Sequence, residues 1–193
     1  YVNPEFHGEG NVASIRRTTR GDVEDGFKEA DFIVDDWFET HPVDQAPLER
    51  ESYIALFEPG GTLTVYAKTQ GPYWEKLWLS KAFRIPQHRI RVVASAVGGG
   101  FGGCLSTRLM YICAAVARKV GGSVPVRMVN TREEEFVCST IRHPIKAYFK
   151  SGVTKEGRIT ARECSAIINN GAFTDNGDLV SAYLGEMFAS TYK

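Results

Sequence analysis

Apolar residues recur along this chain with two periods that alternate. Short runs rich in β-branched and aromatic residues are typical of strands, and spacings of three and four residues are typical of helices. The runs predict strands over 32–38, 52–57, 62–67, 90–96, 124–129, 143–153 and 159–169. Helices are predicted over 22–30, 72–84 and 104–120, after Thr131, and from Thr174 onward. Because hairpins mix with crossover helices, we predict an α+β fold of two layers, a mixed β-sheet with helices packed on one face.

Two local signals support the helices in the second half of the chain. Thr131 and Glu134 form the T-x-x-E pattern of a capping box, which starts a short helix. In the helix predicted over 104–120, four apolar residues recur at helical spacing: Leu105, Leu109, Ile112 and Val116.

Six residues in the middle of the chain, Gly98 to Gly103, read G-G-G-F-G-G and lie between a predicted strand and a predicted helix. Glycines let a backbone adopt positive φ and approach a ligand closely. A loop that leads into a helix also presents unpaired N–H groups, which favour an anion. We therefore expect this segment, the glycine loop, to hold a phosphate or another polar, partly anionic cofactor.

The glycine loop by itself is compatible with three classes of protein, which its neighbouring residues help to separate. The P-loop is excluded, because it needs Lys and Ser/Thr after the last glycine and here Cys104 and Leu105 follow. The Rossmann fingerprint fits formally, and an NADP-binding domain that uses the glycine loop and Arg132 is the alternative hypothesis. Three predicted strands and a helix precede the loop, however, and long hairpin strands follow it. An interaction module with a purely structural glycine turn is the non-enzymatic hypothesis.

Composition narrows the class of protein. The 193 residues contain 23 Lys and Arg and 23 Asp and Glu, so the zero net charge argues against a dedicated nucleic-acid surface. No apolar run has the length of a membrane span. The four cysteines form no C-x-x-C pair, so we predict no metal ligands, and scattered free thiols indicate a reducing, cytoplasmic location. These cysteines are Cys104, Cys113, Cys138 and Cys164.

Further motifs accompany the glycine loop. They are T-Q at 69–70, R-E-E-E at 132–135, R-H-P at 142–144 and N-G-A-F-T-D at 170–175. With the glycine loop they cover about residues 30–185, and their order resembles that of the molybdenum hydroxylase family. This family includes xanthine dehydrogenase, aldehyde oxidase and the molybdenum subunits of bacterial dehydrogenases.

The resemblance implies that the chain is the first of two domains that enclose a molybdopterin. It implies cofactor contacts at Gln70, Gly99, Gly100, Phe101 and Gly102, and no catalytic residue within this chain. The Gln70 amide would donate a hydrogen bond to an oxo ligand of the molybdenum. Phe101 and Leu105 would line the substrate pocket. Arg142 and His143 are interpreted as structural residues.

The chain departs from the purine-oxidising members of this family. Leu105 stands where those enzymes carry a glutamate that holds the purine, and Tyr183 falls near the place of their arginine. Many members carry histidines in an H-x-x-x-E-x-H segment, where this chain has Gln45, Glu49 and Glu51. We therefore expect an aldehyde, an N-heterocycle other than xanthine, or an aromatic acyl-CoA as the small-molecule substrate.

The resemblance also implies parts that this chain lacks. Residues 1–30 are predicted to be an arm from an upstream domain, and 31–193 the first molybdopterin-binding domain, truncated at its C-terminus. The family's catalytic glutamate lies far downstream, where it activates a metal-bound hydroxide while hydride passes to Mo=S. The second molybdopterin-binding half and the iron–sulfur and FAD centres are expected on other domains or subunits. We expect the fragment to be inactive alone, with no membrane or nucleic-acid partner.

Overall fold

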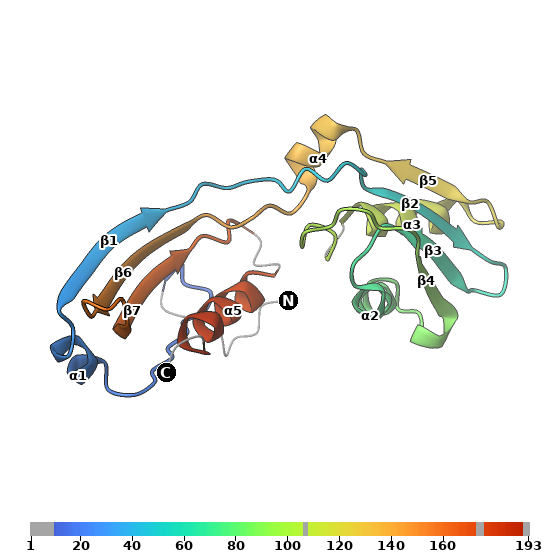
Figure 1. The fold of residues 1–193 in the computed structure, drawn as a ribbon. Helices are drawn as coiled ribbons and strands as arrows, with labels where there is room; N and C mark the ends of the chain where they lie inside the picture. The colour runs from blue at the N-terminus through green and yellow to red at the C-terminus, as the bar shows by residue number, and fades with distance from the viewer. Residues whose placement is uncertain (1–9, 106–107, 173–175, 191–193) are drawn as a thin grey trace. The chain divides into compact units, whose positions relative to one another are not determined.

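The computed structural model in Figure 1 describes residues 10–105, 108–172 and 176–190. Every strand and helix predicted over these residues is present, with its ends displaced by a few residues. The strands are β1 (Phe32–Glu39), β2 (Ser52–Phe57), β3 (Leu63–Ala67), β4 (Ile90–Ala94), β5 (Val126–Val129), β6 (Ile145–Val153) and β7 (Ile159–Ile168). The helices are α1 (Val23–Lys28), α2 (Pro72–Phe83), the short 3-10 helix η2 (Gln87–Arg89), α3 (Arg108–Val120), α4 (Arg132–Cys138) and α5 (Gly177–Ser190).

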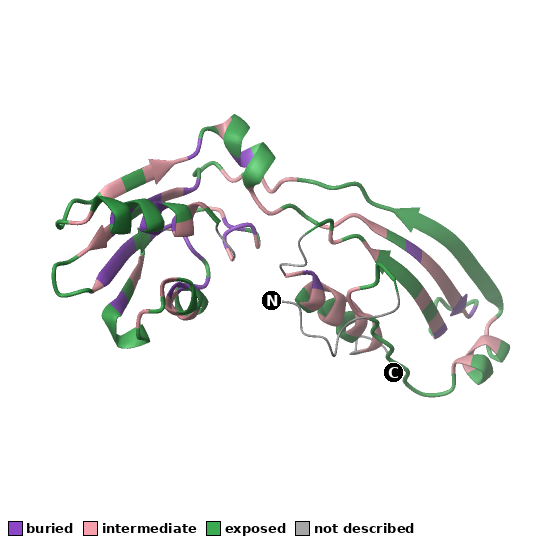
Figure 2. Cartoon of the chain, turned by 180° about the vertical axis from the view of Figure 1, so that it is seen from behind, coloured by how far each residue is buried: buried purple, intermediate pink, exposed green. Residues whose placement is uncertain are grey.

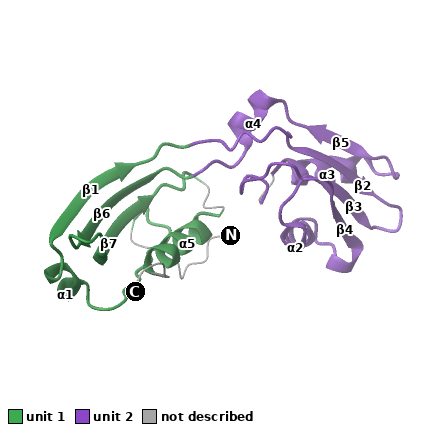
Figure 3. Cartoon of the chain, viewed as in Figure 1, with its two compact units in different colours: residues 1–42, 143–193 green, residues 43–142 purple. Residues whose placement is uncertain are grey.

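The chain divides into two compact units, which Figure 3 shows in different colours. Unit 1 combines residues 1–42 and 143–193, and unit 2 is continuous from Val43 to Arg142. Each unit has its own sheet. The α+β class is therefore confirmed, and the structure adds a second sheet to the one that was predicted. The predicted boundary at residue 30 stays a prediction.

Unit 2 contains the mixed sheet, in the order β4-β3-β2-β5. β3 and β4 are parallel, whereas β2 is antiparallel to both β3 and β5. Residues that alternate along β2 and β3, such as Tyr53, Ala55 and Val65, are fully buried and pack with α2 and α3 in one core. Ile54, which follows Tyr53, and Tyr66, which follows Val65, are exposed. The helices therefore cover one face of this sheet, as predicted.

The helix predicted over 104–120 begins later than expected. α3 starts at Arg108, and Cys104 lies in a turn. The Cys104 N–H donates to the Gln70 side chain, and the Cys104 carbonyl accepts from the Gln70 N–H, so these groups are withdrawn from a helical ladder. The buried face of α3 also differs from the apolar repeat, because Ile112 and Val116 are exposed. The core residues of α3 are Met110, Cys113, Ala114 and Ala117.

Unit 1 contains an antiparallel sheet in the order β1-β6-β7. Helix α5 packs on one face, where Phe149 and Phe188 lie 5.8 Å apart between ring centroids. Gly152 lies next to Phe27 and Ala30 at the end of α1, and a Cβ there would lie 2.9 Å from the Ala30 Cβ. The edge strand β1 is exposed along its whole length (Figure 2), and its five large apolar side chains retain 51–64% exposure.

No helix in the described parts of the chain is long and apolar enough to cross a membrane.

Candidate functional site

The predicted site residues come together at one edge of the sheet in unit 2. β3 and β4 are parallel neighbours with Ala67 paired to Ala94, so the segments that follow them leave the sheet at the same edge. Thr69 and Gln70 follow β3, and the glycine loop follows β4. The approach to β2, including Glu49 and Glu51, reaches this edge from the opposite direction, because β2 is antiparallel to β3.

Gln70 holds the second half of the glycine loop. Its side-chain Oε1 accepts hydrogen bonds from the Gly102 N–H at 3.0 Å and the Cys104 N–H at 3.3 Å. Its backbone N–H donates to the Cys104 carbonyl at 3.0 Å, and the Thr69 hydroxyl lies 3.4 Å from the same carbonyl. Residues 69–70 and 102–104 are therefore fastened together through both backbone and side chain.

These bonds fix the orientation of the Gln70 amide. Two backbone N–H donors require an oxygen acceptor, so the amide cannot be flipped without losing both bonds. The amide oxygen is therefore committed to the loop, and among the described residues the Nε2 group has no hydrogen-bond partner. Gln70 is exposed, so this donor is available to a group outside the chain.

Most glycines of the loop face this chain's own side chains. A Cβ at Gly98 would lie 2.1 Å from the Glu49 carboxyl carbon, and one at Gly100 would lie 2.5 Å from the Gln70 Oε1. At Gly103 it would meet the Gln45 amide at 3.1 Å, and at Gly99 the Phe101 ring at 2.8 Å. These glycines are thus required for packing within the protein, before any ligand is considered.

Phe101 and Gly102 differ from the rest of the loop. A Cβ at Gly102 would meet no atom within 4 Å, and the Gly102 φ is +87°. Phe101 has a φ of +50°, which a non-glycine residue seldom adopts, and its side chain is 75% exposed. A large apolar side chain held in solvent on a strained backbone is typical of a ligand-contacting residue.

Leu105, the other predicted substrate-pocket residue, lies beside the start of α2. A Cβ placed on Gly71 would be 3.8 Å from the Leu105 Cδ2. Its side chain is partly buried and apolar, so it can contact a ligand but cannot hydrogen-bond one.

A buried charged layer, formed by Glu51, Lys68, Glu75 and Glu135, lies at the same edge of the sheet. Their residue exposures are 6%, 3%, 1% and 3%. The Glu51 N–H donates to the Glu135 carboxylate, which also pairs with Arg132 at 2.7 Å. The Glu75 carboxylate accepts from the Tyr111 hydroxyl at 2.6 Å. Carboxylates outnumber the lysine in this layer.

The buried charged layer shifts the titration of Glu51. Burial, reinforced by the nearby Glu135 carboxylate and opposed by Lys68, raises the pKa of Glu51 to about 7. Burial also raises the pKa of the Cys104 thiol. Cys104 is therefore a packed structural residue, with no sign of an activated nucleophile.

Sequence reasoning missed the buried charged layer. Glu51 entered only as a departure from a family segment, and Lys68 not at all. The available signal was weak, because Glu51 and Glu135 stand beside other charged residues, whereas Lys68 directly follows an apolar run and Glu75 follows an aromatic pair. The buried contact of Glu51 with Glu135 joins residues 84 positions apart, which local patterns do not report.

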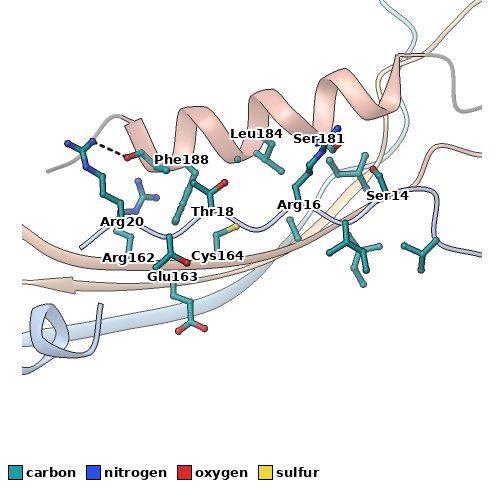
Figure 4. Close-up of a pocket in the computed structure, with 18 of the residues that line it drawn as sticks. Ser14, Arg16, Thr18, Arg20, Arg162, Glu163, Cys164, Ser181, Leu184 and Phe188 are labelled. Atoms are coloured by element: carbon teal, nitrogen blue, oxygen red, sulfur yellow. Dashed lines mark hydrogen bonds between the residues drawn. The ribbon is translucent and has the colours of Figure 1, made fainter. Parts of the chain in front are cut away.

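Figure 4 shows a cavity of about 1380 Å³ in unit 1, lined by residues 10–24, β7 and α5. Its arginines are engaged by the chain itself. Arg16 pairs with Asp178 at 2.6 Å, Arg20 donates to the Ala189 carbonyl, and the Arg162 guanidinium lies 4.8 Å from the Phe188 ring centroid. Asn170 of the N-G-A-F-T-D segment also lines this cavity, whereas residues 173–175 lie outside the described ones. None of the predicted site residues lies there.

In the parts of the chain that the structure describes, no three His, Cys, Asp or Glu side chains are grouped so that they could hold a metal ion.

The topology does not support the alternative NADP-binding hypothesis. In a dinucleotide-binding unit, the strand after the crossover helix lies parallel and next to the strand before the loop. Here β5 lies at the far edge of the sheet from β4, with β3 and β2 between them. Arg132, the proposed 2′-phosphate ligand, pairs with Glu135 and donates to the carbonyls of Pro47 and Leu48.

Comparisons with known proteins agree with the motifs. The nicotinate dehydrogenase large molybdopterin subunit of Eubacterium barkeri is 31% identical over 178 residues, which cover 92% of this chain and 41% of that protein. A probable xanthine dehydrogenase component of Bacillus subtilis (strain 168) is 32% identical over 188 residues, 97% of this chain and 25% of that protein. The chain thus spans less than half the length of these relatives.

A solved structure shares the fold. Reconstituted CO dehydrogenase from Oligotropha carboxidovorans superposes with a TM-score of 0.64 and 30% sequence identity, over 75% of this chain and 18% of that one. A family model described as the molybdopterin cofactor-binding domain matches residues 6–193. With the glycine loop, Gln70 and the sheet edge that joins them, this match shows that the chain belongs to the molybdopterin cofactor-binding domain family.

Proposed function

We propose that the sheet edge of unit 2 forms one wall of the molybdopterin pocket in a hydroxylating oxidoreductase. One observation carries the proposal: the carbonyl oxygen of the exposed Gln70 side chain is fixed by two loop N–H groups, which leaves its amide nitrogen as an available donor. A donor on a fixed amide, bonded to the neighbour of an exposed aromatic residue, is suited to a polar, oxygen-rich cofactor.

The residues present fit such a group. Gly102 has open space at its Cβ position, Phe101 is exposed, and the Gln70 amide nitrogen has no partner among the described residues. We assign cofactor contacts to these three residues first. Gly99 and Gly100 would contribute through backbone groups only, because their Cβ directions are filled by Phe101 and Gln70.

The chemistry requires parts outside this chain. When bound, the cofactor supplies a redox-active metal that accepts the electrons of the substrate. Overall, a C–H bond of the substrate breaks and a C–O bond forms with the oxygen of water, releasing two protons and two electrons. In the proposal, iron–sulfur and flavin centres on other domains or subunits remove the electrons, and a glutamate in the second molybdopterin-binding half acts as the base. Residues 31–193 would be the first half, inactive by itself.

We infer an N-heterocycle or an aldehyde as the substrate class. The relatives named for nicotinate and xanthine support a heterocycle. Leu105 argues against xanthine itself, because a leucine beside the pocket offers no hydrogen bond to a purine. Phe101 would offer a face for stacking on a flat substrate.

Metal and pterin analysis of the full-length enzyme tests this proposal. We expect about one molybdenum and one pterin per active protein, and turnover of an N-heterocycle or an aldehyde. Active enzyme that contains neither molybdenum nor pterin would refute it. An enzyme that contains both but oxidises only an acyl-CoA would overturn the substrate class alone.

A further inference from the structure

Glu49 contacts the first half of the glycine loop. Its Oε2 accepts a hydrogen bond from the Gly99 N–H at 2.8 Å. The same carboxyl group occupies the space in which a Cβ of residue 98 would stand, 2.1 Å from its Cδ. Only a glycine at position 98 therefore lets this carboxylate reach the Gly99 N–H.

The backbone of Glu49 is itself held by a buried lysine. The Lys68 ammonium donates to the Glu49 carbonyl, and Lys68 is only 3% exposed. Lys68 belongs to the segment that follows β3 and directly precedes Thr69 and Gln70. The buried Lys68 thus links Glu49 and Gln70: its ammonium bonds to the Glu49 backbone, and it lies two positions before Gln70 in the chain.

The two side chains hold complementary parts of the loop. Glu49 takes the Gly99 N–H, whereas Gln70 takes the N–H groups of Gly102 and Cys104. Phe101 lies between these attachment points, and its ring covers Gly99, where an added Cβ would be 2.8 Å from the ring. The position of Gly99 therefore determines where the Phe101 ring rests.

We propose that Glu49 is a positioning residue, whose carboxylate fixes the first half of the glycine loop and so sets Phe101 and Gly102 in the cofactor pocket. The role of this placement in a cofactor pocket rests on the proposed function. The contact by which the Glu49 carboxylate orders the glycine loop does not depend on a cofactor.

The electrostatics agree with this geometry. The Gly99 N–H, followed by the backbone N–H of Glu49 itself, lowers the pKa of the Glu49 carboxyl. Burial opposes these hydrogen bonds and raises the pKa of Glu49, and Lys68, the charged group that acts on Glu49, lowers it by less than burial raises it. The carboxylate therefore stays ionised at neutral pH and is available as an acceptor.

Two variants separate the parts of the proposal. Glu49→Gln keeps an oxygen acceptor for the Gly99 N–H but cannot titrate, so the loop should keep its position. Glu49→Ala removes the acceptor, so the Gly99 amide should exchange with solvent about tenfold faster, and the Phe101 and Gly102 signals should shift. Glu133→Gln is the matched control, because Glu133 is another exposed carboxyl with a lowered pKa, and its shift comes from α4, Thr131 and nearby arginines rather than from the glycine loop.

NMR of the labelled 193-residue chain tests the inference. The Gly99 amide proton should titrate with a midpoint below the ordinary glutamate pKa in wild type and in Glu133→Gln, and this titration should vanish in Glu49→Gln. A Gly99 amide that does not titrate, or that titrates equally in Glu49→Gln, would overturn the contact. Unchanged Phe101 and Gly102 signals in Glu49→Ala would overturn the positioning role.

If Glu49→Ala does not fold, the comparison of wild type with Glu49→Gln still decides the contact, and Glu49→Asp decides the positioning. A carboxylate shortened by one methylene should shift the Phe101 and Gly102 signals, and unshifted signals would contradict the role. None of these measurements needs molybdenum. A chain that behaves as expected, in an enzyme that contains no molybdopterin, would refute the proposed function and leave the positioning of the loop intact.

Discussion

The two sides of the glycine loop differ in what surrounds them. On the inner side, Gly98, Gly100 and Gly103 face the side chains of Glu49, Gln70 and Gln45, and the buried charged layer lies at the same sheet edge. On the outer side, Phe101 is 75% exposed and Gly102 has no neighbour within 4 Å of its Cβ position.

This difference separates two uses of glycine. On the inner side, the absence of a side chain makes room for the protein's own hydrogen-bonding groups, so substitution there should damage the fold. On the outer side, positive φ and open space leave the backbone accessible, so substitution there should affect a bound ligand more than stability. The number of glycines alone does not distinguish these uses.

The largest effect is expected in the buried charged layer. Burial raises the pKa of Glu51 from 4.5 to about 7, so the folded state disfavours its ionised form. The stability that the neutral form contributes is complete below about pH 4.5 and is lost as pH rises through 7. Glu51→Gln cannot ionise, so its free energy of unfolding should exceed that of wild type by about 3 kcal/mol at pH 9 and match it at pH 4.

Urea denaturation of both proteins across this pH range measures the effect. Glu58→Gln, in the exposed turn between β2 and β3, is the control and should follow wild type at every pH. If the free energies of unfolding of wild type and Glu51→Gln changed in parallel with pH, the pKa of Glu51 would not be raised in the folded state.

A smaller effect should separate the two kinds of glycine directly. In Gly100→Ala, the new Cβ would lie 2.5 Å from the Gln70 Oε1 and displace that side chain. The loss of its two bonds to Gly102 and Cys104 should cost about 2 kcal/mol. In Gly102→Ala, the space is open and only the φ of +87° opposes the change, so about 1 kcal/mol is expected.

Thermal unfolding of the two variants gives the comparison. Gly60→Ala is a suitable control, because Gly60 has open space and its φ lies outside the positive region. If Gly102→Ala were the more destabilised variant, the division of the loop into an inner and an outer side would be wrong.

The sequence predicts the elements better than it predicts their surroundings. The strands, including the neighbouring runs at 52–57 and 62–67, and the capping box at Thr131 follow from local patterns, and the structure contains each of them. The start of α3 does not follow, because a contact with Gln70, 34 positions earlier, removes Cys104 from the helix. Helical periodicity cannot report a competing tertiary hydrogen bond.

The same limit applies to the site. Gln70 and the glycine loop can be found from motifs, since both are contiguous in sequence. The contact of Glu49 with Gly99, 50 positions away, arises because the start of β2 and the end of β4 lie at the same edge of the sheet. Glycine composition predicts a bare backbone, but only the fold reveals that most of these glycines are covered by the chain itself.

The turnover per bound molybdenum of Gln70→Glu in the full-length enzyme tests the central claim most directly. Glutamate keeps an oxygen for the Gly102 and Cys104 N–H groups, so the loop and the melting temperature should be preserved. It replaces the available amide donor by an acceptor, so turnover per molybdenum should fall at least about tenfold, which corresponds to one hydrogen bond to a charged group. Turnover per molybdenum equal to wild type would contradict the assignment of Gln70 to the cofactor pocket.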